Sequence, residues 1–129
     1  MKNKFFSLWL ALACILFFIL QNIILNFTDL FVLNQQSFLQ PWRFITAIFL
    51  HANLKHLTFN LFALILFGLI LEKLVGSYRF LIVFFTSGLI ANLIAVNFYT
   101  SSLGASGAIY GILGALTVIK PLMTVFAFS

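Results

Sequence analysis

Acidic side chains are almost missing from this 129-residue chain, in which only Asp29 and Glu72 carry a carboxylate. Charged residues of both signs make up 7% of the sequence, whereas hydrophobic residues make up 64% and the mean hydropathy is +1.18. Such a chain cannot supply the polar surface of a soluble domain, so we predict a protein that lies in a lipid bilayer. The net charge of +5 does not indicate a nucleic-acid partner, because the cations lie near the ends of apolar runs, where they anchor and orient membrane spans.

Cysteine is equally scarce, since Cys14 is the only one, and this excludes an internal disulfide. We interpret it as a packing residue in the first apolar run. An alternative is that Ala11–Cys14 forms a lipoprotein cleavage site behind the basic start at Lys2 and Lys4. The apolar run, however, continues to about Leu25 and reaches the roughly 20 residues that cross a bilayer, which favours a retained first span.

Histidine occurs only at His51 and His56, and none follows Ser106. The two histidines are five positions apart, whereas side chains three or four positions apart align on a helix. No carboxylate or cysteine lies close in the sequence to complete a ligand set. We therefore expect no metal site.

Long apolar runs alternate with segments that carry nearly all of the charge. They lack the alternating pattern of a membrane barrel, and a helix satisfies the backbone hydrogen bonds that lipid cannot. We predict an all-α, polytopic helical membrane bundle that forms one domain over residues 1–129. Its spans lie near Phe5–Leu25, Leu54–Leu71, Phe80–Val96 and Gly104–Ile119.

The segment after Ile119 begins a further apolar run and stops. Lys120 and Pro121 predict a short turn, and residues 122–129 rise only about 12 Å as a helix, against a hydrocarbon core of roughly 30 Å. We expect the chain to be interrupted here, with an interfacial tail as the alternative.

The cations divide unevenly between the two ends of the predicted spans. Two of them, Arg43 and Lys55, lie toward one membrane face, and the other five lie toward the opposite face: Lys2, Lys4, Lys73, Arg79 and Lys120. The positive-inside rule then predicts a cytoplasmic N-terminus, in the cell (inner) membrane. With this orientation the segments around His51 and Ser106 both lie toward the outer face.

Ser106 is the candidate nucleophile, set among small residues in the last span. A serine in a membrane helix usually bonds its own backbone or a neighbouring helix. The nearby stripe of small residues usually indicates close helix packing: Gly104, Gly107, Ala108, Gly111, Gly114 and Ala115.

A second polar cluster, upstream, makes a pure packing role for Ser106 less favoured. Polar side chains within membrane spans cost free energy, and they usually face cavities or partners. His56 and Asn60 are four positions apart and share a helix face. Their N–H groups can donate to a developing oxyanion, the largest electrostatic contribution to acyl transfer. For His51 and Asn53, at the predicted helix entry, a capping and hydrogen-bonding role is favoured.

Together these residues resemble the rhomboid family of intramembrane serine proteases. Trp42-Arg43 is similar to a pair in the family's first outer loop, and the spacing of His51, His56 and Asn60 is similar to the opening of its second helix. Glu72-Lys73 before Gly76 resembles the inner end of that helix. The segment Gly104–Gly107, with Tyr110 one turn on, resembles the nucleophile helix.

The resemblance implies that Ser106 attacks a peptide carbonyl of a single-span, membrane-anchored substrate by a serine–histidine dyad mechanism. His56, Asn60 and the backbone N–H of Ser106 would form the oxyanion hole, and Glu72 would be structural. Tyr110 and the glycine stripe would lie beside the helix that carries the catalytic histidine. The family requires no cofactor or metal, and its partners are membrane proteins and the bilayer.

The general base is the departure from the family pattern. The resemblance places it on the sixth helix of a six-helix core, beyond the four complete spans here. We therefore expect a domain truncated after its fourth helix, with an unpartnered small-residue face, and inactive as given unless a second chain supplies the missing helices. A non-catalytic rhomboid-like protein that binds transmembrane helices is the alternative, and half of an unrelated small transporter is a remote third.

Overall fold

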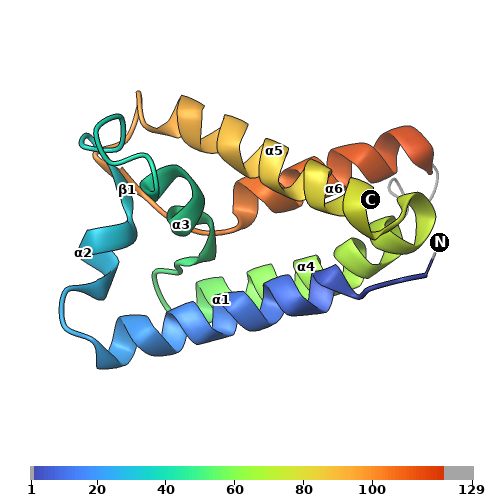
Figure 1. Cartoon of the computed structure of the whole chain (residues 1–129), viewed down its shortest axis with the longest axis horizontal. Coiled ribbons are helices and arrows are strands. Elements are labelled where there is room, and N and C mark those ends of the chain that lie inside the picture. Colours follow the sequence, from blue (N-terminus) through green and yellow to red (C-terminus); the bar gives the residue numbers. More distant parts are fainter. Residues whose placement is uncertain (1, 121–129) are drawn as a thin grey trace.

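The computed structural model describes residues 2–120, most of which lie in helices (Figure 1). The apolar tail from residue 121 onward, for which we expected a turn and a new run, lies outside the described residues. The helices are α1 (Phe6–Ile23), α2 (Phe27–Phe31), α3 (Arg43–Phe49), α4 (Leu54–Val75), α5 (Ser77–Ala95) and α6 (Ser106–Ile119). Two short strands, β1 (Leu33–Asn34) and β2 (Ser101–Ser102), complete the described elements.

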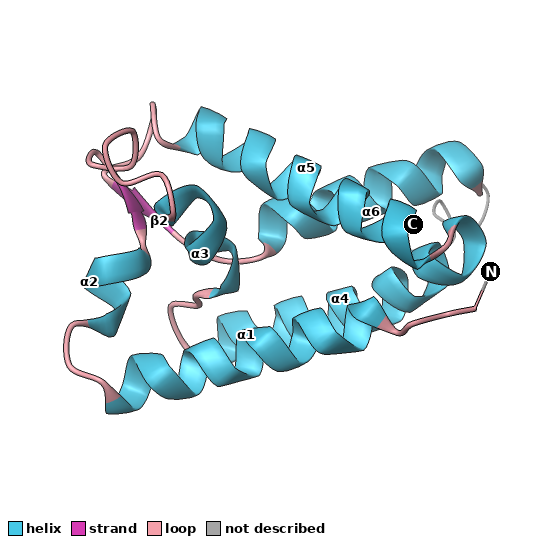
Figure 2. Cartoon of the chain, in the orientation of Figure 1, coloured by secondary structure: helices cyan, strands magenta, loops and turns pink. Residues whose placement is uncertain are grey.

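The long helices form a bundle in which α1 packs along α4, and α5 packs along α6 (Figure 1). Because the chain reverses between successive spans, α1 and α5 begin at the end where α4 and α6 finish. We call this the Glu72 end. The opposite end, where α4 and α6 begin, is the Ser106 end, and it also carries α2, α3 and the β1–β2 pair (Figure 2).

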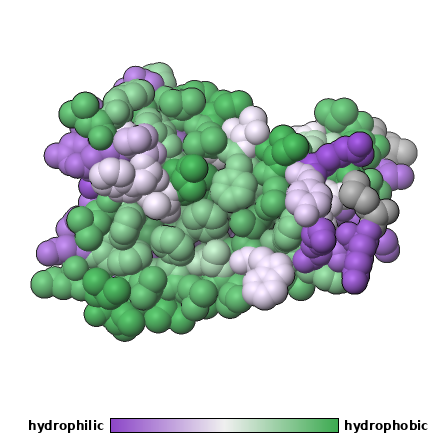
Figure 3. Space-filling model, in the orientation of Figure 1, coloured by the Kyte–Doolittle hydropathy of each residue, from purple (hydrophilic) through white to green (hydrophobic). Residues whose placement is uncertain are grey.

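Three helices, α1, α4 and α5, are long and apolar enough to cross a membrane, which confirms the helical membrane bundle. The fourth, α6, has 14 residues, which correspond to about 21 Å of rise. It is therefore shorter than the span predicted for it. In Figure 3 hydrophobic residues cover the middle of the molecule, and hydrophilic residues gather toward its two ends.

The core lies between the four long helices and is built largely from phenylalanine and leucine. Phe80 and Phe84 of α5 are fully buried, as are Leu64 and Leu71 of α4. Cys14 of α1 is buried in the same cluster, as the packing interpretation predicts. In lipid, moving an apolar side chain into the protein interior gains little free energy from the hydrophobic effect. The close packing of these side chains therefore decides which face of each helix points inward.

One buried carboxylate joins three chain segments at the Glu72 end. Glu72 is 1% exposed. Its two oxygens accept from the backbone N–H groups of Phe6 and Ser7 and from the hydroxyls of Ser7 and Ser77, at distances between 2.6 and 2.9 Å. These residues, the Glu72 cluster, tie the starts of α1 and α5 to the end of α4, and the structural role expected for Glu72 agrees with these contacts.

The glycine stripe of α6 packs against α5, in contrast to the expectation that this face would be unpartnered. A Cβ at Gly107 would collide with Ala91, and one at Gly111 would collide with the side chain of Ser87. The two glycines are four positions apart and share a face, so the backbones of α5 and α6 approach closely. Only Gly114 has open space around it, with no atom within 4 Å of a Cβ placed there.

Candidate functional site

The site begins with the turn that delivers the chain into α6. The β1–β2 pair, with Leu33 opposite Ser102, holds the segment before the turn. The N–H of Gly104 then donates to the Ala47 carbonyl at 2.8 Å, which fixes the turn against the end of α3. Gly104 has φ +113°, a conformation that glycine adopts without the steric cost of a Cβ.

Ser106 is the first residue of α6, where backbone N–H groups have no acceptor within the helix. Its Oγ donates to Oδ1 of Asn60, on the first turns of α4, at 3.2 Å. The structure thus joins two residues that are 46 positions apart in the chain. A helix N-terminus also favours negative charge, so an oxyanion that forms beside Ser106 would meet donors already in place.

His56 lies against the same turn. Its backbone N–H donates to the Asn53 side chain at 2.8 Å, which makes Asn53 the N-cap of α4, as expected. A Cβ at Gly104 would lie 2.7 Å from Cε1 and 3.0 Å from Nε2 of the His56 ring. The absence of a side chain at position 104 is therefore what lets this imidazole reach the start of α6.

The contacts of His56 assign the tautomer of its uncharged form. Nδ1 accepts from the N–H of Ala52 at 3.4 Å. A neutral imidazole has one donor and one acceptor nitrogen, so Nε2 carries the proton. This N–H faces the Gly104 turn next to Ser106, as an oxyanion donor requires.

His51 joins the site through Asn60, with 2.9 Å between its Nε2 and the Asn60 Nδ2. It is 1% exposed, and its Nδ1 has no hydrogen-bond partner among the described residues. Burial, together with the neighbouring His56, lowers the pKa of His51 from 6.5 to about 4, so the ring is neutral at pH 7. His51, His56, Asn60 and Ser106 constitute the Ser106 cluster.

The backbone of His51 is held by Gln21, near the end of α1. The Gln21 side chain accepts from the His51 N–H and donates to the His51 carbonyl, both at 3.0 Å. Beside them lies a cavity of about 470 Å³ that His51, Gln21 and Thr28 help to line. The sequence analysis missed Gln21, although the polar pair Gln21-Asn22 near the end of an apolar run was a signal for it.

Arg43, on which the resemblance rested in part, is buried in the loop region rather than facing solvent. Its guanidinium donates to Gln40 at 2.6 Å and to the carbonyls of Asp29 and Val32 at 2.8 Å each. It therefore stabilises the connection between α1 and α3. The sequence analysis assigned no such contacts, because two of the three acceptors are backbone carbonyls, which the sequence does not distinguish.

Tyr110, one turn after Ser106, is 73% exposed. It shares its helix face with Gly114, whose surroundings are open. No described residue packs on this face as α5 packs on Gly107 and Gly111. The face leads directly from Ser106 down α6.

Comparison with known proteins gives a consistent result. The sequence model of the rhomboid domain matches residues 38–128. Rhomboid protease GluP of Bacillus subtilis is 36% identical over an alignment of 127 residues that covers 92% of this chain and 25% of the relative. RHOMBOID-like protein 6, mitochondrial, of Arabidopsis thaliana is 39% identical over 79 residues, 60% of this chain and 26% of the relative.

A third relative, Inactive RHOMBOID-like protein 8 of Arabidopsis thaliana, is 36% identical over 77 residues, 58% of this chain and 22% of that protein. The chain therefore spans about a quarter of the length of these curated relatives. The domain match covers most of the chain and includes every residue of the Ser106 cluster. With its apolar helical bundle, this integral membrane protein belongs to the rhomboid family.

Proposed function

We propose that this chain carries the nucleophile and the oxyanion hole of an intramembrane serine endopeptidase that cleaves single-span membrane proteins. The observation that carries the proposal is the hydrogen bond from Ser106 Oγ to Asn60, at a helix N-terminus that His56 also approaches. In this mechanism Ser106 Oγ attacks the scissile carbonyl and loses its proton to a base. The carbonyl oxygen becomes an oxyanion.

Three donors are available to that oxyanion: Nε2–H of His56, the Asn60 amide and the backbone N–H of Ser106. Asn60 has two amide hydrogens, and the contact with His51 occupies one of them at most. Removal of one preorganised donor of this kind lowers the catalytic rate by a factor of about 10²–10³. Because the donors come from α4 and α6, the packing of the bundle sets the catalytic geometry.

Neither histidine of the chain suits the role of general base. Nε2 of His51 is in contact with Asn60, and the Nε2 of His56 carries a proton. We infer that the base comes from a histidine outside residues 1–129, in the same protein or in a second chain. The open face of Tyr110 and Gly114 leads to Ser106 and would accept the helix that carries it.

The charge distribution supports the orientation of the protein in the cell membrane. Five of the seven cations belong to the Glu72 end, so this end is the cytoplasmic one in our proposal. The N-terminus would then be cytoplasmic, and the Ser106 cluster would lie near the outer face. Cysteine labelling at exposed Lys2 and Lys55, after replacement of Cys14, tests this orientation directly.

A cleavage assay in native membranes tests the proposed activity. The natural gene product is expressed with a panel of tagged single-span reporters, and the Ser106→Ala variant is compared with Ser101→Ala. Ser101 is an exposed serine at the same end of the bundle but outside the cluster. We expect Ser106→Ala to abolish cleavage and Ser101→Ala to retain it, and cleavage that survives in Ser106→Ala would overturn the proposal.

A second candidate is a rhomboid-like protein that binds transmembrane helices without cutting them. Two observations favour it: one relative is named inactive, and the described residues hold no suitable base. In the same assay this candidate predicts that no reporter is cut. It also predicts that Ser106→Ala co-purifies with its client helices as well as the parent does.

A further inference from the structure

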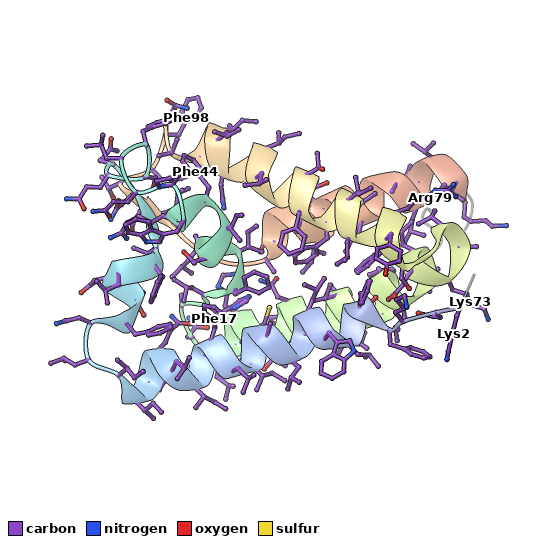
Figure 4. All side chains as sticks on the ribbon, in the orientation of Figure 1. Lys2, Phe17, Phe44, Lys73, Arg79 and Phe98 are labelled. Atoms are coloured by element: carbon purple, nitrogen blue, oxygen red, sulfur yellow. The ribbon has the colours of Figure 1, made fainter. Side chains whose placement is uncertain are left out.

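The Glu72 end concentrates positive charge that the fold leaves uncompensated. Figure 4 shows Lys2, Lys73 and Arg79 at this end of the bundle. None of the three has an ion-pair partner among residues 2–120. Lys4 is close by and lies over the ring of Tyr78, at 5.9 Å from its centroid.

Glu72, the only acidic side chain at this end among residues 2–120, cannot neutralise these cations. Both oxygens of Glu72 are engaged by four donors from Phe6, Ser7 and Ser77, and the side chain is 1% exposed. Its charge is directed inward, to the starts of α1 and α5. Lys2, Lys4 and Lys73 are exposed around it, and their charge is not neutralised by this carboxylate.

A cavity of about 290 Å³ is lined by Lys2 and Lys73, where the N-terminal segment meets the turn from α4 to α5. Lys2 and Asn3 line one side, and Lys73 lines another, with the α4–α5 turn at Gly76. Two ammonium groups and an amide around one hollow suit an oxyanion of phosphate size. The buried carboxylate also lines this cavity, but its oxygens already accept hydrogen bonds.

A second hollow, about 380 Å³ and almost wholly apolar, begins at Lys4 and continues along α1 past Phe5, Leu8 and Trp9 to Leu12. Trp9 is 65% exposed on this face, and tryptophan is enriched where membrane meets water. A charged hollow and an apolar one thus start from the same N-terminal segment. Their combination fits a molecule with an anionic head and a hydrocarbon chain.

We propose that the Glu72 end binds the headgroup of an anionic phospholipid, with its phosphate between Lys2 and Lys73 and an acyl chain along Phe5–Leu12. The bound lipid would bridge the N-terminal segment to the end of α4 and so fasten α1 to the bundle. The inference concerns a different end of the molecule from the Ser106 cluster. It stands or falls independently of proteolysis.

Lipid binding by the full chain in neutral detergent tests the proposal. Dioctanoyl phosphatidylglycerol and dioctanoyl phosphatidylcholine are titrated into the parent, the double variant Lys2→Gln/Lys73→Gln, and Lys55→Gln, with bound lipid counted by native mass spectrometry. Lys55 is a matched control, because it is exposed on the same helix α4 but at the opposite end of the bundle. Inorganic phosphate is the competitor in a separate titration.

We expect the parent to prefer phosphatidylglycerol, and the double variant to lose about fivefold in affinity for each lysine removed. Lys55→Gln should bind as the parent does. Equal binding of the two lipids, an unchanged double variant, or an equal loss in Lys55→Gln would each overturn the proposal. Competition by millimolar phosphate as effective as by the lipid would do so too, since the site would then bind free anions.

Discussion

The two ends of the bundle each bury a polar cluster, and the clusters differ in how completely their hydrogen bonds are satisfied. In the Glu72 cluster both carboxylate oxygens accept two hydrogen bonds each, all from residues within the chain. In the Ser106 cluster Nδ1 of His51 has no partner among the described residues, and Nε2–H of His56 faces a glycine turn. We call the Glu72 cluster closed, because its hydrogen bonds are all made within the chain. We call the Ser106 cluster open, because some of its donors have no partner among the described residues.

Under the proposed function, this difference distinguishes a structural cluster from a reactive one. A fully bonded buried network contributes stability and specifies one packing, and it has no capacity left for a ligand. A cluster whose donors have no partner lowers stability. A protein retains such a cluster where a substrate or a transition state will accept from those donors. On these grounds we assign chemistry to the Ser106 end and anchoring to the Glu72 end.

The largest effect that separates the two ends is expected at His56. The variant His56→Ala removes one oxyanion donor and should lower the rate of reporter cleavage by about 10²–10³. The free energy of unfolding should change by less than about 1 kcal/mol, because the only hydrogen bond lost to the ring is the long one from Ala52. Initial cleavage rates and detergent unfolding of the same preparations measure both. A variant that unfolds readily but cleaves normally when folded would reverse the assignment.

At the closed end, Glu72→Gln should have the opposite profile. It removes a charged acceptor and places an NH2 group against existing donors, so we expect a loss of about 3 kcal/mol in unfolding free energy. Cleavage per folded molecule should remain near the parent value. Lys73→Gln, next to it but exposed, serves as control and should change stability by less than about 0.5 kcal/mol. A catalytic defect with normal stability would contradict the account.

His51 gives the Ser106 end a dependence on pH. Its folded-state pKa of about 4 lies below the ordinary 6.5, so between these values the unfolded chain binds a proton that the folded chain does not. The stability that this provides is present above pH 6.5 and is lost as the pH falls toward 4, about 3 kcal/mol at most. Unfolding of the parent and of His51→Gln between pH 7 and pH 4.5 measures the difference. Parallel curves would refute it.

Glycine substitutions sharpen the comparison within α6 and its turn. Gly104→Ala introduces a Cβ 2.7 Å from the His56 ring at φ +113°, and should destabilise the chain by about 2 kcal/mol. Gly114→Ala, in open space within the helix, should stabilise it by roughly 0.5–1 kcal/mol. Unfolding of both variants of this chain in micelles is the measurement. Effects of the same sign would show that the turn is not packed as described.

The smallest effect is expected at the cap of α4. Asn53→Ala removes the acceptor of the His56 N–H and should cost about 1 kcal/mol. Asn53→Asp keeps an acceptor at this position and should recover most of the loss. If alanine and aspartate behave alike in the unfolding titration, the cap contributes nothing to the entry of α4.

The sequence predicted the long helices, because these depend on local patterns of hydrophobicity. Spacing placed His56 and Asn60 on one helix face, but only the resemblance to the rhomboid family implied that this pair lies with Ser106, which is 46 positions away from Asn60 in the chain. The sequence did not predict α2, α3 or the pairing of β1 with β2. These elements are short, and residues such as Leu33 and Ser102 meet only through the tertiary fold. The partner of the glycine stripe was missed for a related reason: periodicity shows that Gly107 and Gly111 share a face, but not which helix covers it.

The most direct test of the central claim, that the open cluster is reactive, is fluorophosphonate labelling of the natural gene product in native membranes. The probe forms a covalent bond only with an activated serine, and mass spectrometry locates the modified residue. We expect labelling at Ser106 in the parent and in Lys73→Gln, and none in Ser106→Ala. A folded parent that takes up no label at Ser106 would contradict the account and favour the non-catalytic helix-binding protein.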